Sequence, residues 1–203
     1  MPEPLFILLM LIAAGAYTLK AIEQKKRIAL LGSHLGSHQI EKLMESLTDG
    51  YLRALGEENP ERQAQIWSFL ATAEVELCDQ FNRFVAEFAL LEAADTCVSK
   101  LPLAIPYATR LFPKATFDLR KLLSVHARGI TQAANNSQNQ SPKNKAFTMS
   151  AELFLMQHTC HWFCRSKTVA SARMLARHQT PYAQLLASVA PDTRKAYTAL
   201  VGP

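Results

Sequence analysis

The chain of 203 residues is 49% hydrophobic and 19% charged, and it contains 7 glycines. This composition excludes a largely disordered protein, and so few glycines argue against an all-β fold built on many tight turns. The net charge of +5 hides an asymmetry, because residues 39–98 carry twelve acidic and four basic side chains, whereas residues 99–203 carry three acidic and fourteen basic ones.

The first predicted element is a membrane anchor over residues 1–22. Pro4–Leu19 is a run of sixteen residues without a charge, slightly shorter than the ~20 apolar residues of a usual transmembrane helix. Ala21 and Ile22 extend the run if an intervening lysine snorkels toward the headgroups. No Lys or Arg precedes the run, whereas four basic residues follow it closely: Lys20, Lys25, Lys26 and Arg27. The positive-inside rule therefore predicts a single-pass protein of the inner membrane, with its N-terminus outside and its C-terminal domain in the cytoplasm.

Two other interpretations of the apolar run remain open. Residues 14–16, Ala-Gly-Ala, resemble the cleavage site of a secretory signal peptide, but such a peptide carries its positive charge before the apolar run. The run could also form the core helix of a soluble protein. The four cysteines form no regular framework and suit a reducing compartment, although an even number also allows disulfides.

Residues 23–38 are predicted to form a basic juxtamembrane helix that ends in a linker. The basic cluster would lie at the anionic inner leaflet, where each Lys or Arg contributes about 1 kcal/mol. GSHLGSH, residues 32–38, contains two glycines and is expected to break the helix. His34 and His38 have the four-residue spacing of a helical metal pair, but a linker would not hold that geometry.

Residues 39–203 are predicted to form a helical domain. Apolar positions between residues 40 and 55 mark one face of a helix that ends at Gly56. Asn59 is expected to cap a second, long helix that has Pro60 at its first position. Apolar residues then recur every three or four positions, which gives this helix one strongly apolar face.

The second half of the domain is divided by prolines and by a polar stretch. Residues 101–113 contain three prolines and cannot form one regular helix, so we expect a buried, kinked connection or a short segment in the membrane interface. Residues 135–145 are expected to form a polar, mobile loop. Helices are predicted over residues 114–134, 148–179, 182–189 and 192–200. The predicted fold is all-α: one transmembrane helix followed by an irregular bundle of five or six helices.

HTCHWFC, residues 158–164, places two histidines and two cysteines in the long predicted helix. At 100° per residue Cys160 falls on the apolar stripe, whereas His158 and His161 follow a more polar one. Ligands spread over about 160° of one helix cannot converge on a tetrahedral metal. A metal or haem site would therefore need Cys160, His161 and Cys164 to be joined by ligands from another element. Cys160 is most simply a small core residue, and a disulfide to Cys164 would require distortion.

Catalytic motifs are not evident. The sequence contains no glycine-rich phosphate loop, no G-x-S-x-G, no H-E-x-x-H and no EF-hand loop. Glu74, Glu76 and Asp79 are predicted to lie on the solvated face of their helix, opposite its apolar stripe. The sequence therefore favours a protein that is not an enzyme and that carries no cofactor.

The basic C-terminal half contains one candidate basic face, formed by Arg165, Arg173 and Arg177. Arg173 and Arg177 are one helical turn apart, and Arg165 precedes them by about two turns at a similar angle. The face could pair with the acidic half of the chain, or it could meet anionic lipid or an acidic protein. Nucleic acid is not expected, because few exposed aromatic residues accompany these arginines.

These features predict a membrane-anchored helical adaptor or accessory subunit that binds a protein partner at the cytoplasmic membrane face. The alternative is a metal- or haem-binding membrane protein that uses Cys160, His161 and Cys164.

Overall fold

The computed structural model describes residues 4–202, and within them the chain is mostly helical, as predicted. A two-stranded antiparallel sheet, β1 (Cys97–Ser99) and β2 (Thr116–Asp118), is the only strand structure in this part of the chain. The helices are α1 (Pro4–Leu35), α2 (Ile40–Gly56), α3 (Pro60–Phe88), α4 (Ala93–Thr96), α5 (Ala108–Leu111), α6 (Leu119–Ala134), α7 (Pro142–Cys164), α8 (Lys167–His178), α9 (Tyr182–Ser188) and α10 (Pro191–Val201). Six helices longer than ten residues follow α1, in agreement with the predicted bundle.

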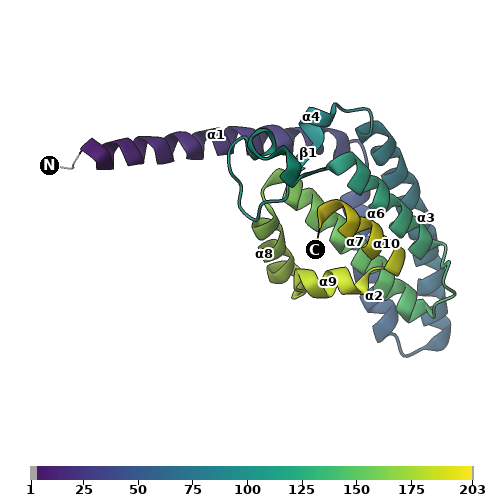
Figure 1. Ribbon diagram of the computed structural model, residues 1–203. Coiled ribbons are helices and arrows are strands. Elements are labelled where there is room, and N and C mark those ends of the chain that lie inside the picture. The colour runs from purple at the N-terminus through teal and green to yellow at the C-terminus, as the bar shows by residue number, and fades with distance from the viewer. Residues whose placement is uncertain (1–3, 203) are drawn as a thin grey trace.

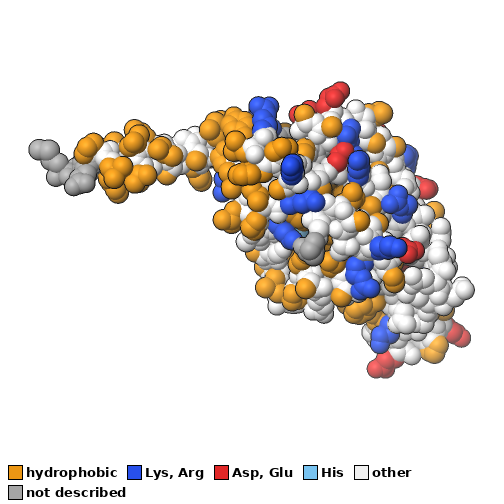
Figure 2. All heavy atoms as spheres, viewed as in Figure 1, with side chains coloured by type: hydrophobic (Ala, Val, Ile, Leu, Met, Phe, Trp, Pro, Cys, Tyr) orange, Lys and Arg blue, Asp and Glu red, His pale blue; other side chains and the backbone are white. Residues whose placement is uncertain are grey.

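The C-terminal part of helix α1 packs on the other helices, whereas its N-terminal part projects from them. It has 32 residues, which corresponds to a length of about 48 Å. Figure 1 shows its N-terminal part projecting far from the body that the other helices form. The projecting part is apolar and exposed along its whole length (Figure 2). By length and composition the helix can cross a membrane, and near the N-terminus a signal sequence meets the same description.

The expected helix break at residues 32–38 is only partly correct. Helix α1 continues through Gly32 to Leu35, and only residues 36–39 separate it from α2. Leu31 is buried, and Leu35 packs against the core. The packing of these two leucines on the body outweighs the helix-weakening effect of glycine, which is only about 1 kcal/mol.

Helices α2 and α3 form an antiparallel pair, in which the predicted end of α2 at Gly56 and the predicted start of α3 at Pro60 are confirmed. Asn59 caps α3, because its side chain accepts hydrogen bonds from the backbone N–H groups of Glu61 and Arg62, and Pro60 begins the helix. The apolar face of α3 supplies Phe81, Phe84 and Phe88, all fully buried. The ring centroids of Phe81 and Phe84 are 5.8 Å apart, and those of Phe84 and Phe88 are 5.5 Å apart. The three rings form one side of the core.

The proline-containing stretch after α3 differs from the expected buried connection. Several of its apolar side chains, including Leu103 and Leu111, are exposed. The helix expected from residue 114 begins at Leu119, because residues 116–118 pair with β1 and the Asp118 side chain caps the helix at the N–H of Arg120. The stretch is therefore a surface loop whose two ends are joined by the small sheet.

The long helix expected over residues 148–179 is two helices. Helix α7 begins at Pro142, so the polar loop is shorter than predicted and covers residues 135–141. It ends at Cys164, and α8 starts after Ser166, whose hydroxyl accepts a hydrogen bond from the N–H of Val169. Helix α7 lies in the middle of the body and packs against α6, α8, α9, α1 and α2 (Figure 1).

Gly129 lies where α6 packs closely against side chains of α7 and α10. A Cβ atom at this position would collide with Glu152 Oε2 and with Thr193 Oγ1. Gly32, in contrast, has nothing within 4 Å of its Cβ position.

We expect Gly129→Ala to destabilise the protein by about 1–3 kcal/mol, because overpacking forces buried neighbours apart. Gly32→Ala is the matched control and should stabilise α1 by about 0.5–1 kcal/mol. Chemical unfolding of the detergent-solubilised full chain, followed by circular dichroism, measures both changes. Equal effects of the two substitutions would contradict the close packing at Gly129.

Candidate functional site

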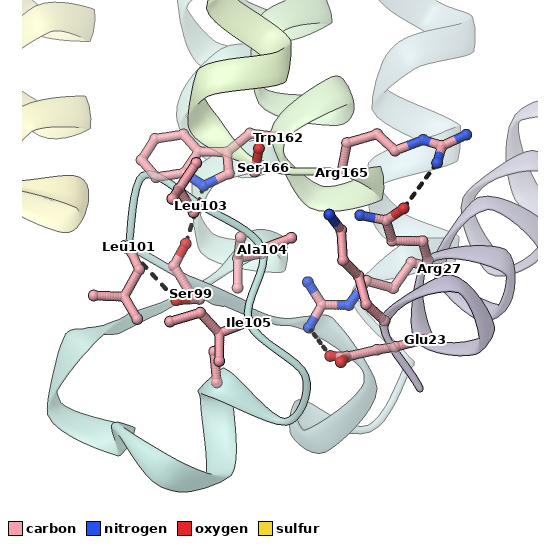
Figure 3. A pocket seen from close by; sticks show the side chains of 14 residues that line it. Glu23, Arg27, Ser99, Leu101, Leu103, Ala104, Ile105, Trp162, Arg165 and Ser166 are labelled. Carbon is pink, nitrogen blue, oxygen red and sulfur yellow. Dashed lines mark hydrogen bonds and ion pairs between the residues drawn. The ribbon is translucent and has the colours of Figure 1, made fainter. Parts of the chain in front are cut away.

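The junction between α1 and the body depends on polar side chains of the second half of α1. The Arg27 guanidinium forms an ion pair with Glu23 at 2.8 Å, donates to the backbone carbonyl of Phe163 at 3.3 Å and lies over the Phe163 ring. Gln24 accepts a hydrogen bond of 2.8 Å from Arg165. Figure 3 shows the Arg27–Glu23 pair, which lies within α1, and the Arg165 hydrogen bond, which joins the end of α7 to α1. These contacts fix α1 to the helix at the centre of the body.

A small cavity lies between α1, the proline-containing loop and the end of α7 (Figure 3). Trp162 forms one wall, and its indole N–H donates to the carbonyl of Ser99 at 3.0 Å. The cavity volume is about 30 Å³, which is enough for one or two water molecules but not for a substrate. The junction is therefore a packed structural contact and not a binding pocket.

The four basic residues predicted to flank the membrane divide into two kinds. Arg27 is half-buried and engaged with the body, as described above. Lys25 and Lys26 are exposed, and Lys20 lies beside the small cavity. Of these four residues, only Lys25 and Lys26 are exposed.

A groove runs along α7 between α1 and α2 on one side and α8 on the other. Its part nearer α1 has a volume of about 390 Å³, and the adjoining part between α2 and α8 has about 480 Å³. The two parts share four lining residues, which are Glu41, Met44, Gln157 and His161. All six residues singled out as the basic face or as candidate metal ligands line it: Cys160, His161, Cys164, Arg165, Arg173 and Arg177.

The walls of the groove carry opposite charges. Helix α2 contributes Glu41, Glu45 and Asp49, and α8 contributes Arg173 and Arg177. Among residues 4–202, none of the ion pairs crosses the groove. The acidic and basic halves of the sequence thus face each other here without direct pairing, which leaves both sets of charges available.

The cysteines of HTCHWFC are poor ligands in this environment. Cys160 is buried, and its thiol lies 3.8 Å from the sulfur of Met156. Burial raises the pKa of Cys160 to about 12 and that of Cys164 to about 11, whereas a metal binds the thiolate. Within residues 4–202, no three His, Cys, Asp or Glu side chains gather in a way that could hold a metal ion.

The histidines of this segment point to different sides. His161 is half-buried at the groove, and its pKa is lowered by burial and by the nearby Arg173 and Arg177. The prediction that His158 lies on a more polar stripe of the helix is wrong, because its side chain is fully buried. Its ring stacks on Tyr182 at 4.7 Å, and its Nε2 lies 3.0 Å from the hydroxyl of Ser171. The reason is that α8 and α9 fold back over α7, which a single long helix would not allow.

The prediction that Glu74 is solvated is wrong. Its side chain is buried, accepts a hydrogen bond of 2.6 Å from the Tyr51 hydroxyl and pairs with the Lys145 ammonium. Glu76 and Asp79 are exposed as expected. The partners come from α2 and from the start of α7, so the spacing within α3 alone carried no signal for this site.

Sequence reasoning also missed a buried polar group between α6, α7 and α10. Glu152 accepts a hydrogen bond of 3.0 Å from the N–H of Ala190, and its carboxyl group lies beside the Thr193 hydroxyl. Burial raises the pKa of Glu152 to about 7. His126 lies nearby on α6, with its Nε2 2.9 Å from the Thr159 hydroxyl, and burial lowers its pKa to about 3.

Comparison of the chain with protein-family models, with curated proteins and with solved structures finds no match to any of them.

Glu152 makes the stability of the protein depend on pH. Its pKa is raised in the folded state, so its protonated form contributes stability that is fully present below pH 4.5 and is lost as the pH rises through 7. The buried His126 and His158 act in the opposite sense, because their lowered pKa values favour folding as the pH rises toward 6.5.

We therefore expect Glu152→Gln, which keeps an acceptor for Ala190, to stabilise the folded state at pH 8 relative to the unsubstituted protein, by on the order of 3 kcal/mol. The advantage should shrink as the pH falls toward 4.5. Glu76→Gln on the exposed face of α3 is the matched control for loss of one carboxylate. Unfolding curves at several pH values measure the difference, and a constant difference would contradict the buried-carboxyl account.

Proposed function

We propose that this protein is a single-pass, membrane-tethered helical adaptor, with its body at the cytoplasmic face of the inner membrane. The observation that carries this proposal is the division of α1. Residues 4–19 are uncharged and almost entirely exposed, whereas the later part of the same helix packs against the body through Arg27 and Leu31. An exposed apolar helix of this length needs a cover, and a bilayer with a hydrocarbon core of about 30 Å matches it.

The alternatives for this helix have less support. A core helix would be buried, yet none of the apolar window of α1 is. A signal peptide carries its positive charge before the apolar run, whereas here no Lys or Arg precedes it. The basic residues follow the apolar run, which favours a cytoplasmic body.

A rigid tether has a consequence for binding. Because α1 is one helix from the bilayer into the body, the body would keep a fixed orientation at the membrane surface. Such a tether restricts the search for a partner to two dimensions and raises the effective concentration of both proteins.

We propose that the partner binds in the groove along α7, between α2 and α8. Its floor includes the apolar side chains of Met44 and Met156, which adapt readily to different shapes. Its walls carry unpaired charges of both signs, which would fix the register of a partner helix or loop. The same groove holds Cys160, His161 and Cys164, but within residues 4–202 no three potential ligands gather around one point, which favours this adaptor over a metal- or haem-binding protein.

The orientation can be tested with a membrane-impermeant thiol reagent. Ser137→Cys, in the exposed loop before α7, should be labelled only after lysis, because the body is cytoplasmic. Pro4→Cys, at the exposed N-terminal end of α1, is the matched control and should be labelled in intact cells. The unsubstituted chain sets the background from Cys97 and Cys164, which are half-buried. Labelling of Ser137→Cys without lysis would overturn the proposed orientation.

The partner surface can be tested with a photo-crosslinking amino acid placed at position 177 or 52, on the two walls of the groove. In native membranes both positions should give the same protein adduct, identified by mass spectrometry. Position 128, exposed on α6, is the control and should give none. Adducts of equal yield at all three positions, or none at 177 and 52, would refute the groove as the partner site.

A further inference from the structure

The loop between the two strands carries an unusual number of exposed apolar side chains. Five of them fall within ten consecutive residues, with the following exposed fractions: Leu103 64%, Ile105 43%, Tyr107 46%, Leu111 62% and Phe112 47%. A single exposed leucine is ordinary, whereas such a concentration on a soluble surface marks an interaction site.

The loop lies against α1 where the apolar part of that helix ends. The N–H of Tyr107 donates to the Glu23 carboxylate at 3.1 Å. Leu103 and Ile105 line the small cavity together with Lys20 and Glu23 (Figure 3). On the other side, Leu19 and Ile22 share a groove with Tyr107. Since one helical residue rises by 1.5 Å, the loop is level with the last residues of the proposed span.

The fold holds the loop in this place from several directions. Pairing of β1 with β2 joins its two ends. The carbonyl of Pro102 accepts hydrogen bonds from the N–H and the hydroxyl of Thr168, at 3.2 and 2.8 Å. Tyr107 adopts a left-handed backbone conformation, with φ of 55°, which is unfavourable for a residue other than glycine. The loop is thus a structured feature whose apolar side chains are left uncovered.

The charges around the loop are those of a membrane-facing segment. Residues 100–117 contain Lys100, Arg110 and Lys114 and no acidic residue. The Arg110 guanidinium lies 5.6 Å from the centre of the Tyr107 ring. Two acidic side chains lie beside the loop, Glu23 on α1 and Asp95 on α4, and the Glu23 carboxylate is paired with Arg27. Apolar side chains bordered by Lys and Arg are typical of segments that lie in the interface of an anionic bilayer.

We propose that residues 101–112 insert into the headgroup–acyl boundary of the same bilayer that α1 crosses. This inference rests on the proposed function, because α1 sets the height of the loop relative to the membrane. The occupant of this apolar surface is lipid: Figure 2 shows hydrophobic side chains gathered where α1 meets the body, continuous with those of α1 itself. The loop would give the body a second attachment point and stop it from rotating about the axis of α1.

The test uses the full chain reconstituted in phosphatidylcholine–phosphatidylglycerol vesicles that contain lipids brominated along the acyl chain. Tryptophan is introduced separately at two loop positions, Leu103→Trp and Leu111→Trp. Ile12→Trp reports on the proposed span, and Phe69→Trp, at an exposed position of α3, is the matched control. The fluorescence of the unsubstituted protein, which contains Trp67 and Trp162, is subtracted.

We expect both loop reporters to lose fluorescence, most strongly with bromine near the headgroups, and Ile12→Trp to lose most with bromine deep in the chain. Phe69→Trp should lose none. Quenching of Ile12→Trp without quenching of either loop reporter overturns the inference but leaves the anchor intact. Failure of all three overturns the proposed function as well. Loop reporters that shift to shorter wavelength only as protein concentration rises, without quenching, assign the surface to a second copy of the chain and overturn the inference.

Discussion

The attachment of Arg27 to the end of α7 is the contact on which the architecture depends. Its guanidinium holds Glu23 one turn earlier on α1 and the carbonyl of Phe163 on the body. Leu31 adds a buried apolar contact one turn later. Because both lie on a helix that continues without interruption toward residue 4, the apolar half of α1 has a defined direction relative to every other element. A flexible linker in its place would leave the body free to turn.

The fixed direction of α1 determines where several other surfaces of the protein lie relative to its apolar half. In the proposed arrangement the proline-containing loop contacts the membrane because it lies beside Glu23, and the exposed Lys25 and Lys26 lie near the headgroups. The groove along α7 begins at the same junction, where Ile28 and Leu31 form part of its lining. We therefore propose a helical body that one anchor and one loop orient on the membrane, with its partner surface along α7.

Much of the fold could be predicted from local features of the sequence, whereas the features that were missed depend on contacts between residues far apart in the chain. The Asn59–Pro60 cap and the apolar face of α3 were recognisable because capping and helical periodicity act within a few residues. The break at Ser166 was missed, since the residues on both sides of it continue a helical pattern. The burial of Glu74 depends on Lys145, which is 71 positions away. The sequence pointed to two separate sets of site residues, a candidate metal set and a basic face: Cys160, His161 and Cys164, and Arg165, Arg173 and Arg177. Only the fold shows that both sets line one groove, with the acidic side chains of α2 on its opposite wall.

Hydrogen exchange of the vesicle-reconstituted full chain tests the central claim, that α1 is one continuous helix from the bilayer into the body. The account predicts slow exchange of the backbone amides throughout residues 19–31, because each is hydrogen-bonded within the helix and half of this stretch is held by the body. Fast exchange between residues 20 and 26, with protection on both sides, would reveal a flexible hinge and contradict it.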